Sequence, residues 1–233
     1  MQDTQGKANR DLAMRAVRRL LSAMVIMAAA FFGAAGTFRW PAAWAYLLLQ
    51  STFSGALGAW LYRNNPGLLE QRLQVTKRSA LPADKFIMAA GLLLMAPYLV
   101  LPGLDAVRYQ WSSVPAGVQA ASFGAVLASL ALLAWVMREN TYLYRFVEVL
   151  PGQRVITSGP YAVVRHPLYA ALSVYFLAVP LALGSLWCLF PAAGIVLLLI
   201  YRTVIEDRTL LRDLAGYAEY ARRVRYRLVP GLW

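Results

Sequence analysis

Hydrophobic residues gather in long runs along the chain, separated by short polar connections. Four runs are easy to place, at residues 20–38, 43–62, 86–104 and 116–137. Each is close to the roughly 20 residues that a helix needs to cross a bilayer. Backbone groups in lipid find no water to bond, and no series of alternating ten-residue segments indicates a barrel. Each run is therefore predicted to be a membrane-spanning helix.

A fifth hydrophobic run, at residues 168–201, is too long for one span. It is interrupted by Pro180, Gly184 and Ser185, which favour a turn and a fresh helix cap. This pattern predicts a tight helical hairpin. The predicted fold is all-α, an integral membrane protein with about six membrane segments: four spans plus the C-terminal hairpin.

Composition supports the membrane class. Of 233 residues, 60% are hydrophobic and only 15% are charged, beyond the apolar share of ordinary soluble domains. The net charge of +12 can indicate nucleic acid, but the basic residues alternate with apolar runs, so anionic lipid headgroups are the expected partner and nucleic acid is not. The single cysteine, Cys188, excludes a disulfide framework or thiolate metal site within the chain, and no metal is expected.

Lysines and arginines divide unequally between the two sides of the predicted spans. The N-terminal tail holds five, the connection 63–85 holds five, the connection 138–165 holds four, and the region from residue 202 onward holds seven. Only Arg39 and Arg108 remain for the other side. The positive-inside rule then places both termini in the cytoplasm, as in a bacterial inner membrane. The first run also has features of a secretory signal, but its length and the similar runs after it favour a retained span.

Acidic residues are absent from the first four runs, which argues against a channel or a proton pump. Polar residues able to do chemistry concentrate after Met137. We therefore expect residues 1–137 to form a transmembrane scaffold. Residues 138–233 are expected to form a module with its function on the cytoplasmic face.

The stretch GPYAVVRHPLYAA, residues 159–171, contains the only histidine of the chain. Pro167 suits the first turn of a helix, which places His166 at or just before the N-cap, where an anion is favoured. The alternative is a simple boundary motif, in which Arg165 binds lipid phosphate and His166 merely caps the helix.

Two further patterns follow the last hydrophobic run. Glu206 and Asp207 lie just beyond it, with Arg202 one helical turn earlier. These acids can hold a cationic or polyhydroxylated ligand, or form a salt-bridged, solvated helix face. In residues 216–233, tyrosines mixed with arginines are typical of a segment that lies on lipid headgroups.

Taken in order, ITSGPYAVVRHPLY, the hairpin, the acidic pair and GYAEYARRVRYRLVPGLW resemble the isoprenylcysteine carboxyl methyltransferase family and the related phospholipid methyltransferases. The resemblance covers about residues 138–233. Upstream, NNPGLLEQRL followed by DK is similar to bacterial-type members. The resemblance implies a membrane enzyme that uses S-adenosylmethionine in a cytoplasmic pocket closed by the C-terminal region. Its lipid-like acceptor would come from the bilayer.

The resemblance also implies site residues. Arg202 matches a family arginine associated with the substrate, and we expect Arg202 and Glu206 to be catalytic. Cofactor contacts are expected at Gln153, Arg154, Val155, Ile156, Tyr161, His166, Pro167, Leu168, Tyr169, Glu206 and Asp207.

Methyl transfer from a sulfonium mainly requires that donor and acceptor be positioned, so a dedicated acid or base is optional. An arginine suits a carboxylate acceptor, which favours carboxyl O-methylation, whereas an amine acceptor would need a general base. Two alternatives stay open: a sterol-reductase-like enzyme that uses NADPH and ends in a comparable tyrosine pattern, and a nonenzymatic membrane scaffold.

Overall fold

A computed structural model describes residues 2–73, 82–143, 149 and 152–233. Its regular structure is helical throughout these residues. The elements in chain order are α1 (Gln2–Ala35), α2 (Pro41–Asn64), α3 (Pro66–Leu73), α4 (Pro82–Gly103), the π-helical turn η1 (Leu104–Arg108), α5 (Ala116–Glu139), the 3-10 turn η2 (Gly159–Ala162), α6 (Pro167–Ala182), α7 (Leu189–Asp213) and α8 (Tyr217–Arg223).

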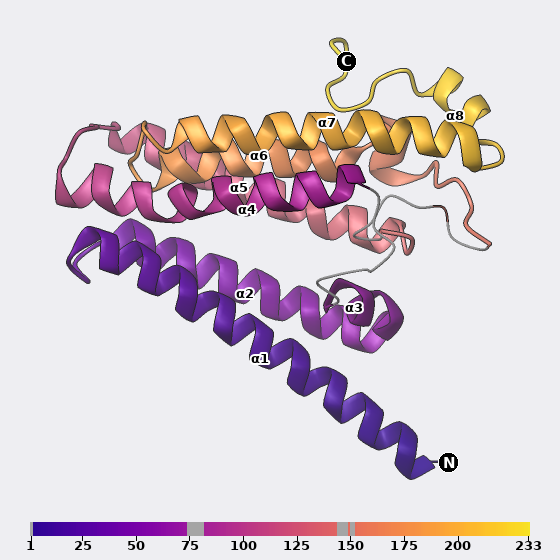
Figure 1. Ribbon diagram of the computed structural model, residues 1–233, viewed down its shortest axis with the longest axis horizontal. Coiled ribbons are helices and arrows are strands. Elements are labelled where there is room, and N and C mark those ends of the chain that lie inside the picture. Colours follow the sequence, from indigo (N-terminus) through magenta and orange to yellow (C-terminus); the bar gives the residue numbers. More distant parts are fainter. Residues whose placement is uncertain (1, 74–81, 144–148, 150–151) are drawn as a thin grey trace.

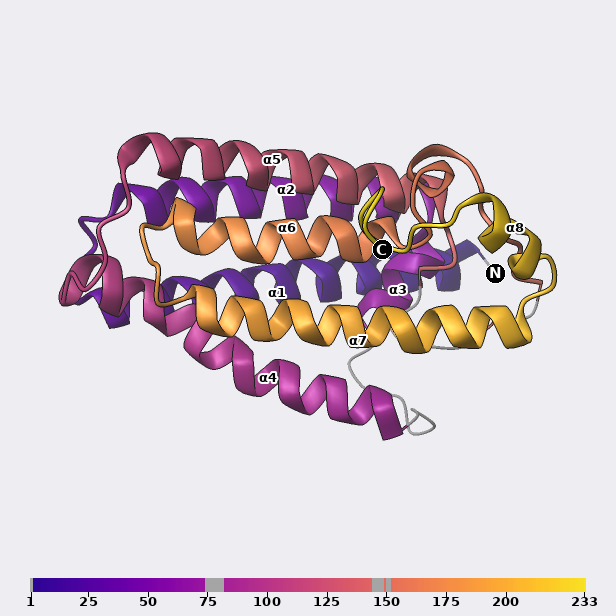
Figure 2. The ribbon, with the colours of Figure 1, turned by 90° about the horizontal axis from the view of Figure 1, so that it is seen from above.

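The long helices lie in two layers, and α1 and α2 are inclined to the other four (Figure 1). Helices α4 to α7 form one layer and α1 with α2 form the other (Figure 1). Seen from above, α5, α6 and α7 lie side by side in that order, with α4 beyond α7 (Figure 2). Helix α3, α8 and the N-terminal end of α1 share one end of the assembly, which we call the α8 end. The opposite end carries the turns that join α1 to α2, η1 to α5, and α6 to α7.

Four helical segments are long and apolar enough to cross a membrane: Arg10–Ala35, Ala83–Arg108, Ala116–Glu139 and Leu189–Asp213. Three of the four predicted single spans are among them. The predicted span 43–62 is helical, as part of α2, but is not one of these segments; polar Gln50, Thr52 and Ser54 dilute its middle. The protein is thus an integral membrane protein, while the total of about six membrane segments stays a prediction.

The predicted hairpin is present as α6 and α7, and Gly184 turns the chain between them with a φ of +87°. Pro180 lies inside α6 instead of in the turn. Ser185 is not the N-cap of α7, which is Cys188; its hydroxyl accepts the backbone N–H of Cys188 at 3.1 Å in the turn before the helix. The same hydroxyl donates to Asp105 at 2.6 Å.

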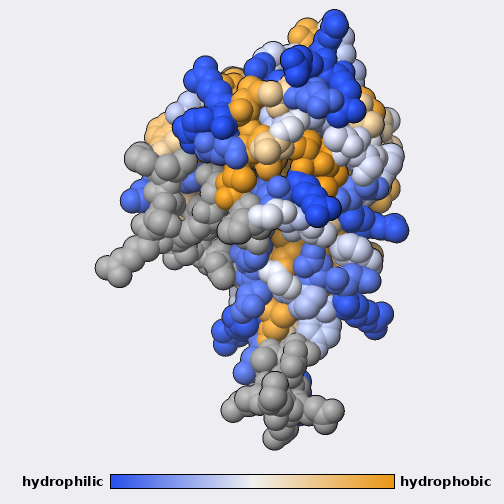
Figure 3. All heavy atoms as spheres, turned by 90° about the vertical axis from the view of Figure 1, so that its right-hand side faces the viewer, coloured by the Kyte–Doolittle hydropathy of each residue, from blue (hydrophilic) through white to orange (hydrophobic). Residues whose placement is uncertain are grey.

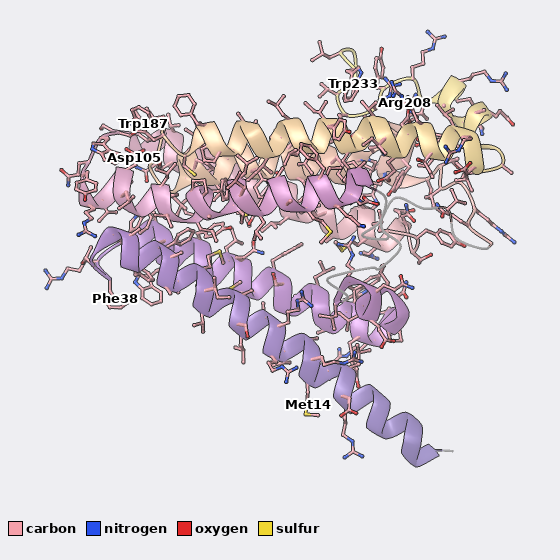
Figure 4. The ribbon with its side chains drawn as sticks, viewed as in Figure 1. Met14, Phe38, Asp105, Trp187, Arg208 and Trp233 are labelled. Carbon is pink, nitrogen blue, oxygen red and sulfur yellow. The ribbon has the colours of Figure 1, made fainter. Side chains whose placement is uncertain are left out.

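Two helical segments extend past the polar residues expected to end them. Asp84 and Asp105 belong to the segment Ala83–Arg108, and the pair Glu206 and Asp207 lies within α7. Each buried acid has protein partners in place of water. One oxygen of Asp105 accepts bonds from Ser112, Ser185 and the Trp187 N–H, which ties the helix turns together at the opposite end (Figure 4). The predicted helix ends were wrong because the acids were taken as boundaries, whereas the folded protein pairs these charges inside it.

Helices α1 and α4 approach each other closely at Gly103. A Cβ added there would lie 2.6 Å from the Phe31 carbonyl oxygen and 2.8 Å from the Ala35 nitrogen. Backbone atoms cannot move aside as the tip of a side chain can. The absence of a side chain at residue 103 therefore permits the close contact of α1 and α4 at this point.

Gly103→Ala should destabilise the protein by about 1 to 3 kcal/mol, the usual cost of overpacking. The measurement is the thermal unfolding temperature of the purified protein in detergent. Gly91→Ala, in the same helix, is the matched control because nothing lies within 4 Å of its added Cβ. Equal unfolding temperatures for the two variants would show that the layers do not depend on this contact.

Candidate functional site

A cleft lies at the α8 end, where η2, the start of α6, the end of α7 and α8 meet. It encloses about 790 Å³, counted together with its space open to solvent. Figure 3 looks onto this end, where hydrophilic residues dominate and hydrophobic residues show between them. The lining residues are Asn140, Tyr142, Leu143, Gln153, Arg154, Val155, Ile156, Tyr161, Arg165, His166, Leu168, Tyr169, Glu206, Thr209, Leu210, Leu214, Tyr217 and Tyr220.

The carboxylate of Asp207 is the centre of the polar network behind this cleft. It is buried and binds the Arg165 guanidinium through both oxygens, at 2.9 and 3.0 Å. Tyr217 donates to it at 2.8 Å, Arg227 at 2.9 Å, and the His166 Nε2 lies 3.1 Å away. Two oxygens with this many partners have little capacity left for a ligand.

Arg165 extends the network into the C-terminal segment. Its Nη1 donates to the carbonyls of Val224 and Arg225, both at 3.0 Å. Its backbone N–H bonds the carbonyl of Tyr226, and that of His166 bonds the carbonyl of Arg227, both at 2.9 Å. The alternative in which Arg165 binds lipid phosphate is therefore wrong, because the guanidinium is buried and fully used inside the protein.

His166 does occupy the N-cap position of α6, but its side chain makes no capping hydrogen bond. The ring instead lies between the two acids of α7. Its Nε2 faces Asp207, while its Nδ1 lies 3.8 Å from the Glu206 carboxylate. The position predicted from the sequence is confirmed, and the capping role is wrong.

Three buried tyrosines form part of the wall. Tyr220 donates to the Tyr161 carbonyl at 2.8 Å, and the Tyr161 hydroxyl accepts from Asn140 at 2.8 Å. Burial raises the pKa of the Tyr161, Tyr217 and Tyr220 hydroxyls above its usual value, and the Asp207 carboxylate raises that of Tyr217 further. These hydroxyls stay neutral and keep their protons for hydrogen bonding.

Glu206 begins a second chain of polar contacts. Its carboxylate accepts the Tyr169 hydroxyl at 2.5 Å, and that hydroxyl accepts Arg202 Nε at 2.7 Å. Arg202 Nη1 then binds Asp84, at the start of α4, at 3.2 Å. The second Asp84 oxygen is buried without a hydrogen-bond partner among the described residues. The chain therefore runs from the cleft to the contact between α4 and α7.

Nine of the eleven residues expected at a cofactor line this one cleft. Pro167 is buried at the start of α6, and Asp207 lies behind the wall, bound by protein groups. Glu206 lines the cleft, whereas Arg202 does not. Arg145, another arginine of the connection 138–165 that could bind an acceptor carboxylate, lies outside the described residues.

Sequence reasoning missed several residues of this cleft. Tyr217 and Tyr220 were assigned to the lipid surface, yet both are buried and face inward. Their spacing of three residues places them on one face of a helix, and this spacing could have indicated that they face inward together. Asn140 and Thr209 carry no pattern that distinguishes them in the sequence. Only the three-dimensional arrangement brings them to the cleft.

The comparison with protein families bears on this same part of the chain. Residues 121–212 match the family model "Isoprenylcysteine carboxyl methyltransferase (ICMT) family". The chain carries a domain of the ICMT family. It is therefore a methyltransferase, and enzymes of the ICMT family use S-adenosylmethionine. A search of curated proteins found no match.

The matched ICMT region begins in α5 and ends one residue before the end of α7. It contains the 153–169 segment, Arg202 and both acids of α7. It decides against the reductase and scaffold alternatives. Helix α8, whose Tyr217 and Tyr220 line the cleft, lies outside the match, as does the C-terminal segment.

Proposed function

We propose that this ICMT-family enzyme methylates a carboxylate of a lipid-like, isoprenoid-type molecule that reaches the cleft from the bilayer. The observation that supports the proposal most is the position of the cleft. Its polar lining residues lie at the ends of the apolar helices α5, α6 and α7. The α8 end also carries most of the basic residues, which supports a cytoplasmic location for it and for both termini.

The residues of the cleft fit S-adenosylmethionine. Tyrosine rings stand beside polar groups in its lining, a combination common at small-molecule sites. Among the described residues of the lining, Glu206 is the one carboxylate, and its side chain is 26% exposed. A partly open carboxylate next to aromatic rings matches a ligand with an ammonium group, ribose hydroxyls and an adenine.

In this proposal Glu206 accepts hydrogen bonds from the amino or ribose groups, and the start of α6 near His166 receives the methionine carboxylate. Tyr161 or Tyr169 packs against the adenine or the sulfonium. When bound, the cofactor supplies a methyl group on an already activated leaving group. The protein then has to align the acceptor with that group and exclude water.

The acceptor is expected to approach between α4 and α7. Phe86 and Tyr201 are both exposed there, and their rings meet edge to face at 6.2 Å. Arg202 follows Tyr201 in α7 and is held by Tyr169 and Asp84. A planar guanidinium suits a carboxylate through two parallel bonds. An acceptor carboxylate would have to take the place of Asp84 on Arg202.

S-adenosylhomocysteine should raise the thermal unfolding temperature of the purified protein, and NADPH should not. His166→Ala and Glu206→Ala should each weaken its binding about 5- to 150-fold, the equivalent of about 1 to 3 kcal/mol for a lost hydrogen bond to a charged group. Isothermal titration calorimetry measures the dissociation constants. Glu219→Ala is the matched control, because this exposed acid on α8 does not line the cleft. Unchanged binding in both cleft variants would refute the cofactor placement.

Arg202→Lys tests the carboxylate acceptor. Lysine keeps the positive charge but loses the bidentate geometry, so methyl transfer should fall at least about tenfold while S-adenosylhomocysteine affinity stays close to wild type. The assay measures transfer of labelled methyl groups to a panel of isoprenoid and fatty acids. Arg208→Lys, on the exposed side of α7 (Figure 4), is the control. Equal activity in both variants would remove Arg202 from acceptor binding.

A further inference from the structure

A second polar cleft lies between α1 and α3, away from the methyltransferase site. It is lined by Arg15, Arg18, Arg19, Ser22, Glu70 and Leu73. Arg15 pairs with Glu70 at 3.2 Å, and Arg19 donates to the Leu73 carbonyl. Arg18 makes no hydrogen bond or ion pair among the described residues. Among the described lining residues, three arginines against one glutamate give two excess positive charges.

An apolar groove follows directly on this cleft along α1. Its lining residues are Ala13, Met14, Val17, Arg18, Leu21, Ser22 and Val25. The larger apolar side chains of the groove are more than half exposed. Met14 points away from the rest of the protein (Figure 4). Arg18 and Ser22 line both the cleft and the groove, so the two form one continuous surface.

The groove continues from Val25 into a second hollow between α1 and α2, which reaches Ala28 and Trp44. The ten residue steps from Arg18 to Ala28 span about 15 Å of helix, at 1.5 Å per residue. That length is half of the roughly 30 Å hydrocarbon core of a bilayer. With Arg18 at headgroup level, the groove is as deep as one leaflet.

We propose that this surface binds an anionic phospholipid. The phosphate accepts bonds from Arg18 and Ser22, and one acyl chain lies along Val17, Leu21 and Val25. A basic pocket beside a membrane helix is a recognised site for anionic headgroups. The excess positive charge favours an anionic lipid over a zwitterionic one, since Glu70 is already paired with Arg15. The site is independent of the methyl acceptor, because none of its residues lines the catalytic cleft.

The test uses the full-length protein purified in neutral detergent and mixed with equal amounts of phosphatidylglycerol and phosphatidylcholine. Native mass spectrometry then counts the lipids that stay bound. We expect at least about fivefold more phosphatidylglycerol than phosphatidylcholine on the wild-type protein, and loss of about that factor in Arg18→Gln. Arg18→Lys should keep most of the preference, because it keeps the charge.

Arg10→Gln is the matched control. Arg10 lies on the same helix and is exposed, but it lines neither the cleft nor the groove. The Arg10→Gln substitution removes the same overall charge as Arg18→Gln and should leave the preference for phosphatidylglycerol unchanged. Equal retention of the two lipids by the wild-type protein would overturn the proposal. So would an equal loss of preference in Arg10→Gln and Arg18→Gln.

Discussion

The structure of the catalytic end depends on one buried carboxylate, that of Asp207. An isolated charge at this position would cost several kcal/mol, so the carboxylate has to be paired and hydrogen-bonded. Its partners come from three places: Arg165 and His166 before α6, Tyr217 on α8, and Arg227 in the C-terminal segment. Because one anion satisfies all of them, these segments have to assemble around α7 together.

This arrangement explains how membrane helices provide a polar cleft without a separate soluble domain. Helix α7 carries two adjacent acids with different roles. Asp207 points into the protein and holds the C-terminal segment in place, whereas Glu206 lines the cleft. Tyr217 and Tyr220 then close the wall from α8. The ICMT match ends before α8, yet the cleft is incomplete without it.

The long apolar runs predicted the helices well because burial in lipid leaves the backbone no alternative to a helix. The order of the motifs also located most of the cleft, including His166, Tyr169 and Glu206. The partners of each charge could not be predicted. Arg165 and Asp207 are 42 residues apart, and Arg202 and Asp84 are 118 apart. Such pairings follow from packing in three dimensions, and the same pairings let helices run past the acids that seemed to end them.

The most direct test of the central role of Asp207 is hydrogen–deuterium exchange of Asp207→Asn and wild-type protein, each with and without S-adenosylhomocysteine. In the wild-type protein the ligand should protect residues 153–169 and 217–227 together. In Asp207→Asn, which keeps the shape but loses the charge, residues 217–227 should exchange rapidly and the ligand should protect neither segment. Slow exchange of residues 217–227 in Asp207→Asn, with ligand protection equal to wild type, would contradict the account.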